Sequence, residues 1–318
     1  IQMMTLRLAD LAQVLDASLI GGDHEITAVS TDTRTLGAGA LFVALRGERF
    51  DAHDFCDQAV AAGASALLVE RELPLAIPQL VVGDTLKALG RLGRLVRERI
   101  NPKVLAITGS CGKTTVKEMA TAILRCEGEV LATAGNFNNE VGVPLTLLRL
   151  EPQHQFAVME LGANHPGEIA WTTSLARPDA AIINNVAAAH LEGFGSLEGV
   201  FHAKSEIFEG LGEGGTAIVN ADNEFWPKWR EKGIHCAFSL EDPRQPFHAR
   251  DIVLNEQGCA GFVMVTPQGE VNLTLAIPGR HNVANALAAA AGTLALGASL
   301  ASVKAGLEQM APVKGRFC

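Results

Sequence analysis

The sequence predicts an α/β fold in which a small N-terminal α/β domain is followed by a larger domain with a doubly wound, mostly parallel sheet. Apolar runs of strand length alternate with stretches of helical periodicity along most of the 318 residues. A glycine-rich segment at 108–115 joins one apolar run to a helical stretch, as at the edge of a parallel sheet. At 248–277 apolar residues alternate instead, which predicts a small antiparallel appendage on the larger domain.

Residues 1–83 predict the smaller domain, because short apolar runs bounded by turn residues follow an opening helical pattern. A linker helix is expected at 84–102, since Leu residues repeat at helical spacing until Asn101-Pro102 ends the pattern. Within the smaller domain we expect a helix at 8–15, a strand at 40–45, a helix at 54–62, and strands at 66–69 and 80–82.

The central domain is expected at 103–313, where the strand and helix patterns alternate regularly. Residues 314–318 are expected to begin a connector. The predicted strands are 104–108, 129–132, 156–161, 180–185 and 216–219. The predicted helices begin at 113, span 167–176 and 198–210, and begin again near Asn282 and at Leu300.

Composition and charge describe a globular chain and argue against several functions. Hydrophobic residues make up 48% and charged residues 19%, and no apolar run reaches the roughly 18 residues that cross a bilayer, so no membrane insertion is expected. The first residues lack the basic-then-apolar order of a secretory signal, which predicts a cytoplasmic protein. A net charge of −9 with scattered Lys and Arg argues against a nucleic-acid partner. The six cysteines form no C-x-x-C pair, so neither a zinc site nor a disulfide framework is expected.

The segment 108–115, T-G-S-C-G-K-T-T, is typical of a P-loop that cradles phosphate groups. Its glycines let backbone N–H groups face phosphate oxygens, and the following helix adds partial positive charge. Lys113 supplies a cation and Thr114 a hydroxyl for Mg²⁺, so ATP is the expected ligand. The common motif has Gly where this chain has Ile107, and a glycine turn that serves only strand–helix packing is the alternative. The candidate ATP ligands are Gly109, Ser110, Cys111, Gly112, Lys113, Thr114 and Thr115.

Polar residues that could complete a metal site follow the later strands. Glu160 ends an apolar run, so its carboxylate is expected beside the phosphate loop, with capping of the next helix as the alternative. His190 lies in the loop after the 180–185 strand, where a metal ligand belongs, although a lone His is more often an ordinary hydrogen-bonded residue. For Lys204, sequence spacing predicts only a solvated helix residue.

Two Asn-rich segments are candidates for binding polar ligands. The glycine loop with Asn136, Asn138 and Asn139 offers neutral amides for a polar ligand, or uses Asn for left-handed turn conformations. Asn282 opens the Ala-rich helix, where it could be the N-cap or could contact adenine through its paired donor and acceptor.

Taken together, these segments resemble the Mur ligases, ATP-dependent enzymes that form amide bonds in peptidoglycan precursor synthesis. The resemblance covers essentially the whole chain, and it is strongest toward the member that joins D-alanyl-D-alanine to UDP-N-acetylmuramoyl-tripeptide. The phosphate loop alone would also fit another Mur-type ligase or a folylpolyglutamate-type ligase. The stretches that carry the resemblance are 30–34, 41–47, 108–115, 135–144, 160–169, 189–195 and 279–285.

The resemblance implies a catalytic centre with two Mg²⁺ ions. Lys113 and Thr114 would contact ATP and the first ion, and Glu160 would reach toward the metal. His190 would bind the second ion together with Lys204, which CO₂ would carbamylate and so convert from a cation to an anion. The implied catalytic residues are Lys113, Glu160, His190 and Lys204, and the implied metal ligands are Thr114, Glu160, His190 and Lys204.

The resemblance also assigns the two ends of the substrates. Asn282 would contact adenine, and Arg316 would bind the nucleotide. The N-terminal domain would bind the UDP-sugar, and the Asn-rich loop would face the peptide substrate. The residues implied for substrate binding are Ser30, Thr31, Asp32, Thr33, Arg34, Arg46, Gly47, Asn136, Asn138 and Asn139.

The implied reaction proceeds through an acyl phosphate and needs no protein nucleophile. In the family a third domain follows the Gly-Arg pair that matches Gly315-Arg316, so we expect this chain to lack that domain and, on its own, to ligate little. We also expect a monomer. A P-loop kinase or molecular switch and a non-catalytic nucleotide-binding scaffold are the alternatives from other functional classes.

Overall fold

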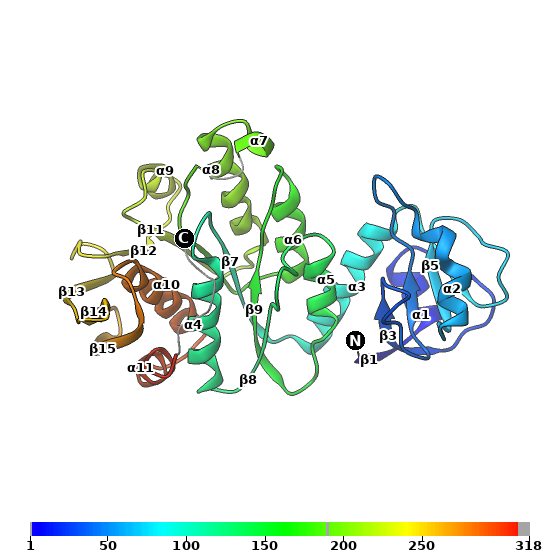
Figure 1. Ribbon diagram of the computed structural model, residues 1–318, viewed down its shortest axis with the longest axis horizontal. Helices are drawn as coiled ribbons and strands as arrows, with labels where there is room; N and C mark the ends of the chain where they lie inside the picture. Colours follow the sequence, from blue (N-terminus) through cyan, green and yellow to red (C-terminus); the bar gives the residue numbers. More distant parts are fainter. Residues whose placement is uncertain (1, 189–190, 311–318) are drawn as a thin grey trace. The chain divides into compact units, whose positions relative to one another are not determined.

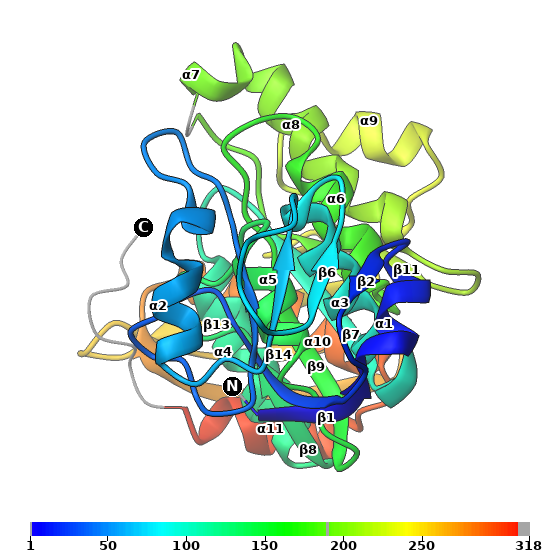
Figure 2. The same ribbon diagram turned by 90° about the vertical axis from the view of Figure 1, so that its right-hand side faces the viewer.

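The computed structural model describes residues 2–188 and 191–310, and the chain divides into two compact units. The N-terminal unit holds the residues up to 101 together with 140–152, and the central unit holds 102–139 and the residues from 153 on. Figures 1 and 2 show both units as ribbons, with the N-terminal unit in blue and cyan except for its green segment at 140–152. The return of 140–152 to the first unit was not among the sequence predictions.

A six-stranded mixed sheet forms the centre of the N-terminal unit. Its elements are β1 (Gln2–Arg7), α1 (Leu8–Val14), β2 (Ser18–Ile20), β3 (Glu25–Ser30), β4 (Leu41–Val43), the 3₁₀ turn η1 (Ala52–Phe55), α2 (Cys56–Ala61), β5 (Ala66–Val69), β6 (Gln79–Val81), α3 (Thr85–Ile100) and α5 (Gly142–Leu147). The strand order is β1-β3-β4-β5-β6-β2, with β3 to β6 parallel and both edge strands antiparallel. Apolar side chains from β4 and β5, such as Phe42 and Leu67, pack with Cys56 and Ala59 of α2.

The linker helix α3 has a defined cap at each end. The Asp84 side chain accepts a hydrogen bond from the Lys87 N–H at 3.1 Å, and Asn101 ends the helix in the left-handed conformation with φ of 52°. Gly93 allows α3 to pack closely on α5, because a Cβ at this position would lie 2.9 Å from the Cα of Pro144. This helix pair joins 140–152 to the N-terminal unit.

A nine-stranded sheet forms the central unit. Its elements are β7 (Lys103–Thr108), α4 (Lys113–Arg125), β8 (Glu129–Ala132), β9 (His154–Glu160), α6 (Glu168–Ala176), β10 (Ala180–Ile183), α7 (Leu191–Phe194), α8 (Leu197–Ser205), the 3₁₀ turn η2 (Glu206–Gly210), β11 (Thr216–Asn220), α9 (Trp226–Glu231), β12 (Cys236–Ser239), β13 (Phe247–Leu254), β14 (Cys259–Thr266), β15 (Gly269–Pro278), α10 (His281–Ala295) and α11 (Leu300–Glu308). The order is β15-β14-β13-β12-β11-β10-β7-β9-β8, parallel from β8 to β13 and antiparallel from β13 to β15.

This topology confirms the predicted fold class, including the antiparallel appendage that β13, β14 and β15 form. One predicted helix differs in detail, because the pattern at 198–210 folds as α8 followed by the tighter turn η2. In the described part of the chain, no helix combines the length and the apolar character needed to cross a membrane.

Helices cover the central sheet on both sides of its core. The apolar side chains of α4, α10 and α11 pack in one cluster with alternate residues of the strands, such as Leu105, Ile107 and Ile182. The helix α6 contacts β7, and η2 contacts β10. Because β7, β9 and β10 are parallel, with Ile107 beside Glu160 and Thr108 beside Ile183, their carboxyl ends meet at one edge.

Candidate functional site

The phosphate loop lies between β7 and α4 in the predicted strand–loop–helix order. Gly109 and Gly112 have φ of +151° and +81°, which L side chains rarely adopt. Gly112 also needs to be glycine for space, because a Cβ would lie 2.7 Å from Nδ2 of Asn184 and 2.9 Å from Oδ1 of Asn285. The loop can therefore bring its backbone close to a ligand.

Two consecutive asparagines after β10 bind the backbone of the phosphate loop through their side chains. Oδ1 of Asn185 accepts from the N–H groups of Ser110 at 3.1 Å and Cys111 at 2.9 Å, and its Nδ2 donates to the Cys111 carbonyl at 2.9 Å. Asn184 donates to the same carbonyl at 2.9 Å and to Oδ1 of Asn285 at 3.0 Å. The sequence analysis missed both asparagines, although their position at the end of a central parallel strand was a usable signal.

A pocket of about 530 Å³ opens in front of this loop within the central unit. Asn220 at the end of β11, and His281 and Asn285 in the first turns of α10, contribute polar groups that the sequence analysis did not assign. Backbone N–H groups, amides and one cation in such a pocket suit a phosphorylated ligand. The lining residues are Ser110, Cys111, Gly112, Lys113, Thr114, Thr115, Asn184, Asn185, Asn220, Leu240, His281, Ala284 and Asn285.

The predicted cation, Lys113, is the first residue of α4, and the predicted acid, Glu160, lies beside the next residue, Thr114. The Thr114 hydroxyl is 3.4 Å from both carboxylate oxygens of Glu160, and Lys113 Nζ donates to the Gly109 carbonyl at 2.9 Å. Burial lowers the pKa of the Lys113 ammonium, and the Glu160 carboxylate acts in the opposite direction. A hydroxyl beside a carboxylate is a donor set that Mg²⁺ accepts.

A second lysine, Lys117, supports Glu160 and was also missed by the sequence analysis. Its buried Nζ donates to the Thr133 carbonyl at 2.7 Å and lies 4.0 Å from Glu160 Oε2. The Thr133 hydroxyl in turn accepts from the Glu160 N–H at 3.0 Å. The spacing of four residues from Lys113 on α4 was the available signal, because it places both lysines on one face of the helix.

Lys204 is buried, so the sequence prediction of a solvated helix residue is wrong. Only 2% of Lys204 is exposed, at the end of α8. Burial, and next the charge of Lys113, lower the pKa of Lys204 to about 8, and Glu168 partly opposes this shift. The fold thus brings Lys204 within electrostatic reach of the phosphate-loop lysine, 91 positions earlier in the chain.

The remaining predicted residues of the central unit have varied surroundings. Asn282 is not an N-cap, since α10 begins at His281, and its buried amide donates to the Pro278 carbonyl and accepts from Asn285. Its contact with adenine stays a prediction. Asn136 and Asn139 are exposed, and Asn138, half-buried, accepts from the Gly162 N–H with its carbonyl. His190 and Arg316 lie outside the described residues.

Among the described residues, no group of three or more His, Cys, Asp or Glu side chains is arranged to hold a metal ion. A metal here would depend on the pair Thr114 and Glu160, with further oxygen ligands from phosphate groups or from a modified side chain. This is the usual situation for Mg²⁺, which shares its coordination between the protein and substrate phosphates.

The predicted substrate residues of the N-terminal unit gather at one edge of its sheet. β3 and β4 are parallel, so the segment 30–34 and Arg46 both follow strand ends at the same edge. Asp32 binds Arg34 through two hydrogen bonds of 3.0 and 2.9 Å, which lower the pKa of the Asp32 carboxyl. Ser30 accepts from the Asp32 N–H at 3.1 Å and thereby closes the turn.

Comparison with known proteins agrees with this geometry. The model of the Mur ligase middle domain matches residues 107–293, and the model described as Mur ligase family, catalytic domain, matches residues 25–97. The chain belongs to the Mur ligase family. The match to the middle domain spans the phosphate loop, Glu160, Lys204 and the start of α10.

Within the family the chain is most usefully compared with MurF proteins. It is 54% identical to the UDP-N-acetylmuramoyl-tripeptide–D-alanyl-D-alanine ligase of Escherichia coli K12, over 99% of this chain and 70% of that protein. A crystal structure of MurF from Acinetobacter baumannii superposes with a TM-score of 0.94 at 43% identity, covering 99% of this chain and 70% of that chain. MurF of Thermotoga maritima in complex with ADP gives a TM-score of 0.79 at 29% identity, covering 91% and 67%. The chain is thus a MurF-type, ATP-dependent Mur ligase sequence.

Proposed function

We propose that this chain binds ATP and a UDP-linked peptide for a ligase that adds D-alanyl-D-alanine to UDP-N-acetylmuramoyl-tripeptide. The observation that carries the proposal is the pocket in front of the phosphate loop, which Lys113 and Thr114 line, with Glu160 beside the Thr114 hydroxyl. The substrates named for the E. coli relative and the ADP named for the T. maritima structure support it. The expected setting is a cytoplasmic monomer.

In this proposal the phosphate loop binds the triphosphate of ATP. Backbone N–H groups at the start of α4 and the Lys113 ammonium neutralise the phosphate oxygens. Thr114 and Glu160 would hold Mg²⁺, which supplies charge neutralisation for phosphoryl transfer. Asn184 and Asn185 keep the loop in shape, and His281 and Asn285 line the pocket where the rest of the nucleotide would lie.

Lys204 is proposed to become a carbamate. Only a neutral amine attacks CO₂, and the lowered pKa of Lys204, about 8, provides that form near neutral pH. The ammonium first loses one proton, and the attack then forms an N–C bond, moves a C=O electron pair onto oxygen and releases a second proton, so a buried cation becomes an anion. A carbamate at Lys204 would attract Lys113 and would supply oxygen ligands for a second Mg²⁺, with His190 as the predicted partner.

The reaction then follows in two steps. The terminal carboxylate of the UDP-linked tripeptide attacks the γ-phosphorus of ATP, forms a C–O–P bond and expels ADP. The neutral amine of D-alanyl-D-alanine attacks the acyl carbon, forms the amide bond and loses a proton, while the C–O bond to phosphate breaks and phosphate leaves. Lys113 stabilises the charge on the transferred phosphoryl group, so catalysis by this unit consists mainly of positioning and electrostatics.

Phosphate release from a chimeric enzyme tests the proposal. This chain would replace the matched part of the E. coli relative, which it covers for 70% of that protein's length. We expect ATP-dependent phosphate release only when UDP-N-acetylmuramoyl-tripeptide and D-alanyl-D-alanine are both present, and Lys113→Ala should abolish it. Phosphorylation of a stable product without the dipeptide would support a kinase and contradict the proposal.

A further inference from the structure

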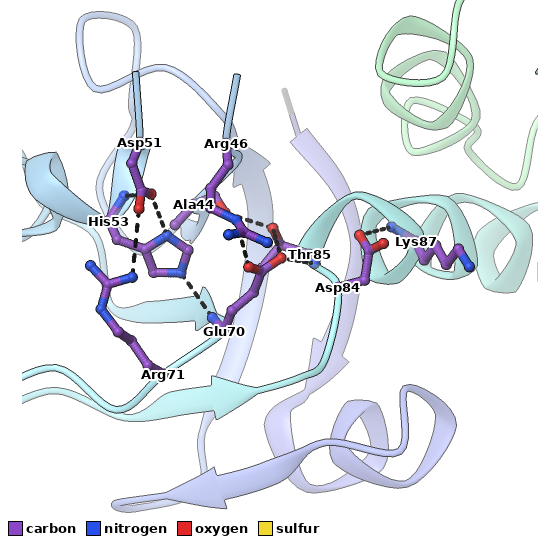
Figure 3. A network of polar contacts seen from close by, with 9 residues as sticks. All are labelled: Ala44, Arg46, Asp51, His53, Glu70, Arg71, Asp84, Thr85 and Lys87. Atoms are coloured by element: carbon purple, nitrogen blue, oxygen red, sulfur yellow. Dashed lines mark hydrogen bonds and ion pairs between the residues drawn. The ribbon is translucent and has the colours of Figure 1, made fainter. Parts of the chain in front are cut away.

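A connected polar network surrounds Arg46 in the N-terminal unit (Figure 3). Arg46 Nε lies 2.8 Å from Glu70 Oε1, which fixes the guanidinium at its inner nitrogen. The side chain of Arg46 is 59% exposed and that of Glu70 only 14%. The largely buried carboxylate therefore orients an exposed cation, whose outer nitrogens can face a ligand.

Both carboxylate oxygens of Glu70 have partners. Oε1 forms the ion pair with Arg46, and Oε2 accepts from the Thr85 N–H at 3.0 Å and lies 3.3 Å from its hydroxyl. Thr85 is the first residue of α3, where the helix dipole favours a negative charge, and its hydroxyl donates to the Ala44 carbonyl at 2.7 Å. Glu70 is thus fixed by α3 on one side while it holds Arg46 on the other.

The backbone of Glu70 is held as firmly as its side chain. Its N–H donates to Nε2 of His53 at 2.8 Å, and the opposite ring nitrogen of His53 lies 2.6 Å from Asp51 Oδ1. Since Nε2 accepts, Nδ1 carries the proton and donates to Asp51. The His53 side chain is fully buried, so these two hydrogen bonds fix its position.

Arg46 and Asp51 form the base of one short hairpin. They pair across an isolated β-bridge, and the Gly47 N–H donates to the Phe50 carbonyl at 2.9 Å to close the turn. Arg46 contacts the Glu70 carboxylate directly, and Asp51 is connected to the Glu70 backbone through His53, as Figure 3 shows. Contacts with Glu70 therefore fix the position of both ends of the hairpin.

We propose that Glu70 is a positioning residue, which holds Arg46 toward a phosphate of the nucleoside diphosphate at the UDP end of the substrate. The inference rests on the proposed function, which assigns the UDP-sugar to this unit. An arginine already fixed at Nε loses less conformational freedom when its outer nitrogens bind phosphate, so the network raises the affinity for the phosphates. His53 and Asp51 act one step further away by fixing the backbone of Glu70.

The test compares UDP with uridine as ligands of the full 318-residue chain, by ligand-detected NMR titration. In Glu70→Gln, one end of the side chain becomes an NH₂ group that must face a donor, either Arg46 or Thr85, so the anchoring fails. We expect UDP to bind about tenfold more weakly, as for Arg46→Ala, and uridine to bind within about twofold of wild type. Glu72→Gln, the loss of the same charge at an exposed position, should change neither.

A double variant and a pair of His53 variants distinguish positioning from a structural role. Adding Glu70→Gln to Arg46→Ala should weaken UDP no further, because both changes remove one interaction. His53→Gln, whose amide oxygen can replace Nε2, should keep more UDP affinity than His53→Asn. Equal losses for UDP and uridine, or additive losses in the double variant, would overturn the inference. Failure of the wild-type chain to bind UDP would instead refute the proposed function of this unit.

Discussion

The buried amine of Lys204 gives the most quantitative prediction. Its pKa of about 8 lies about 2.5 units below the ordinary value of 10.5, because burial and the charge of Lys113 disfavour the ammonium. At pH 7.5 roughly a quarter of the folded molecules carry the neutral amine, against about one in a thousand for an ordinary lysine. The amount of the form that reacts with CO₂ is therefore raised on the order of 200-fold.

The same shift makes the stability of the protein depend on pH. The unfolded chain binds the Lys204 proton more tightly than the folded chain does, so folding is opposed by about 3 kcal/mol at any pH below about 8. As pH rises from about 8 to 10.5 the folded protein releases the proton first, and this opposition disappears. Lys204→Met lacks the titrating group, so its stability should not show this rise.

Urea unfolding in CO₂-free buffer at pH 7.5 and 9.5 measures the effect. We expect the stability advantage of Lys204→Met over wild type to shrink by about 2 kcal/mol between these two pH values. Lys103→Met, which removes an exposed lysine of the same unit, should keep a constant difference from wild type. A pH-independent difference for Lys204→Met would refute the reasoning. When bicarbonate is added near pH 8, wild type and Lys103→Met should gain a labile adduct of about 44 Da, the mass of CO₂, and Lys204→Met should gain none.

Two further substitutions test the phosphate loop and its support. Gly112→Ala should weaken ATP binding by about tenfold or more in calorimetric titration, because φ of +81° and the closeness of Asn184 and Asn285 exclude a Cβ. Gly212→Ala is the control and should bind ATP normally, because the space around Gly212 is open. Equal ATP affinity in both variants would show that the loop does not bind the nucleotide. Lys117→Met should destabilise the protein by roughly 1–3 kcal/mol in urea unfolding, because it leaves the Thr133 carbonyl without its buried partner and Glu160 with one neighbouring cation fewer. A neutral result for Lys117→Met would mean that water or another side chain replaces Nζ.

Local patterns predicted the fold and the phosphate loop well. β5 and β8 have the predicted bounds, α3 begins after its Asp84 cap, and α4 begins at Lys113, because the signals for these elements lie within a few residues. Glu160 was placed correctly beside Thr114, since adjacent parallel strands bring their ends together. Short-range sequence information was sufficient for these features.

Contacts between distant segments were not predictable in this way. Lys204 is buried at the end of α8, and this helix packs through Phe201 against Phe225 and Trp229, which follow more than twenty positions later. The hydrogen bond between Asn184 and Asn285 joins residues 101 positions apart. Hydrophobic periodicity describes one element at a time, so it shows neither the burial of a lysine by other elements nor the partners of an asparagine.

The most direct test of the central claim follows one oxygen atom. When the terminal carboxylate of UDP-N-acetylmuramoyl-tripeptide is labelled with ¹⁸O, an acyl-phosphate route carries one labelled oxygen into the phosphate released by the chimeric enzyme. Mass spectrometry of that phosphate should therefore show one ¹⁸O atom for each amide bond formed. Unlabelled phosphate would mean that water attacks ATP, and it would contradict the assignment of the Lys113 pocket to acyl-phosphate formation.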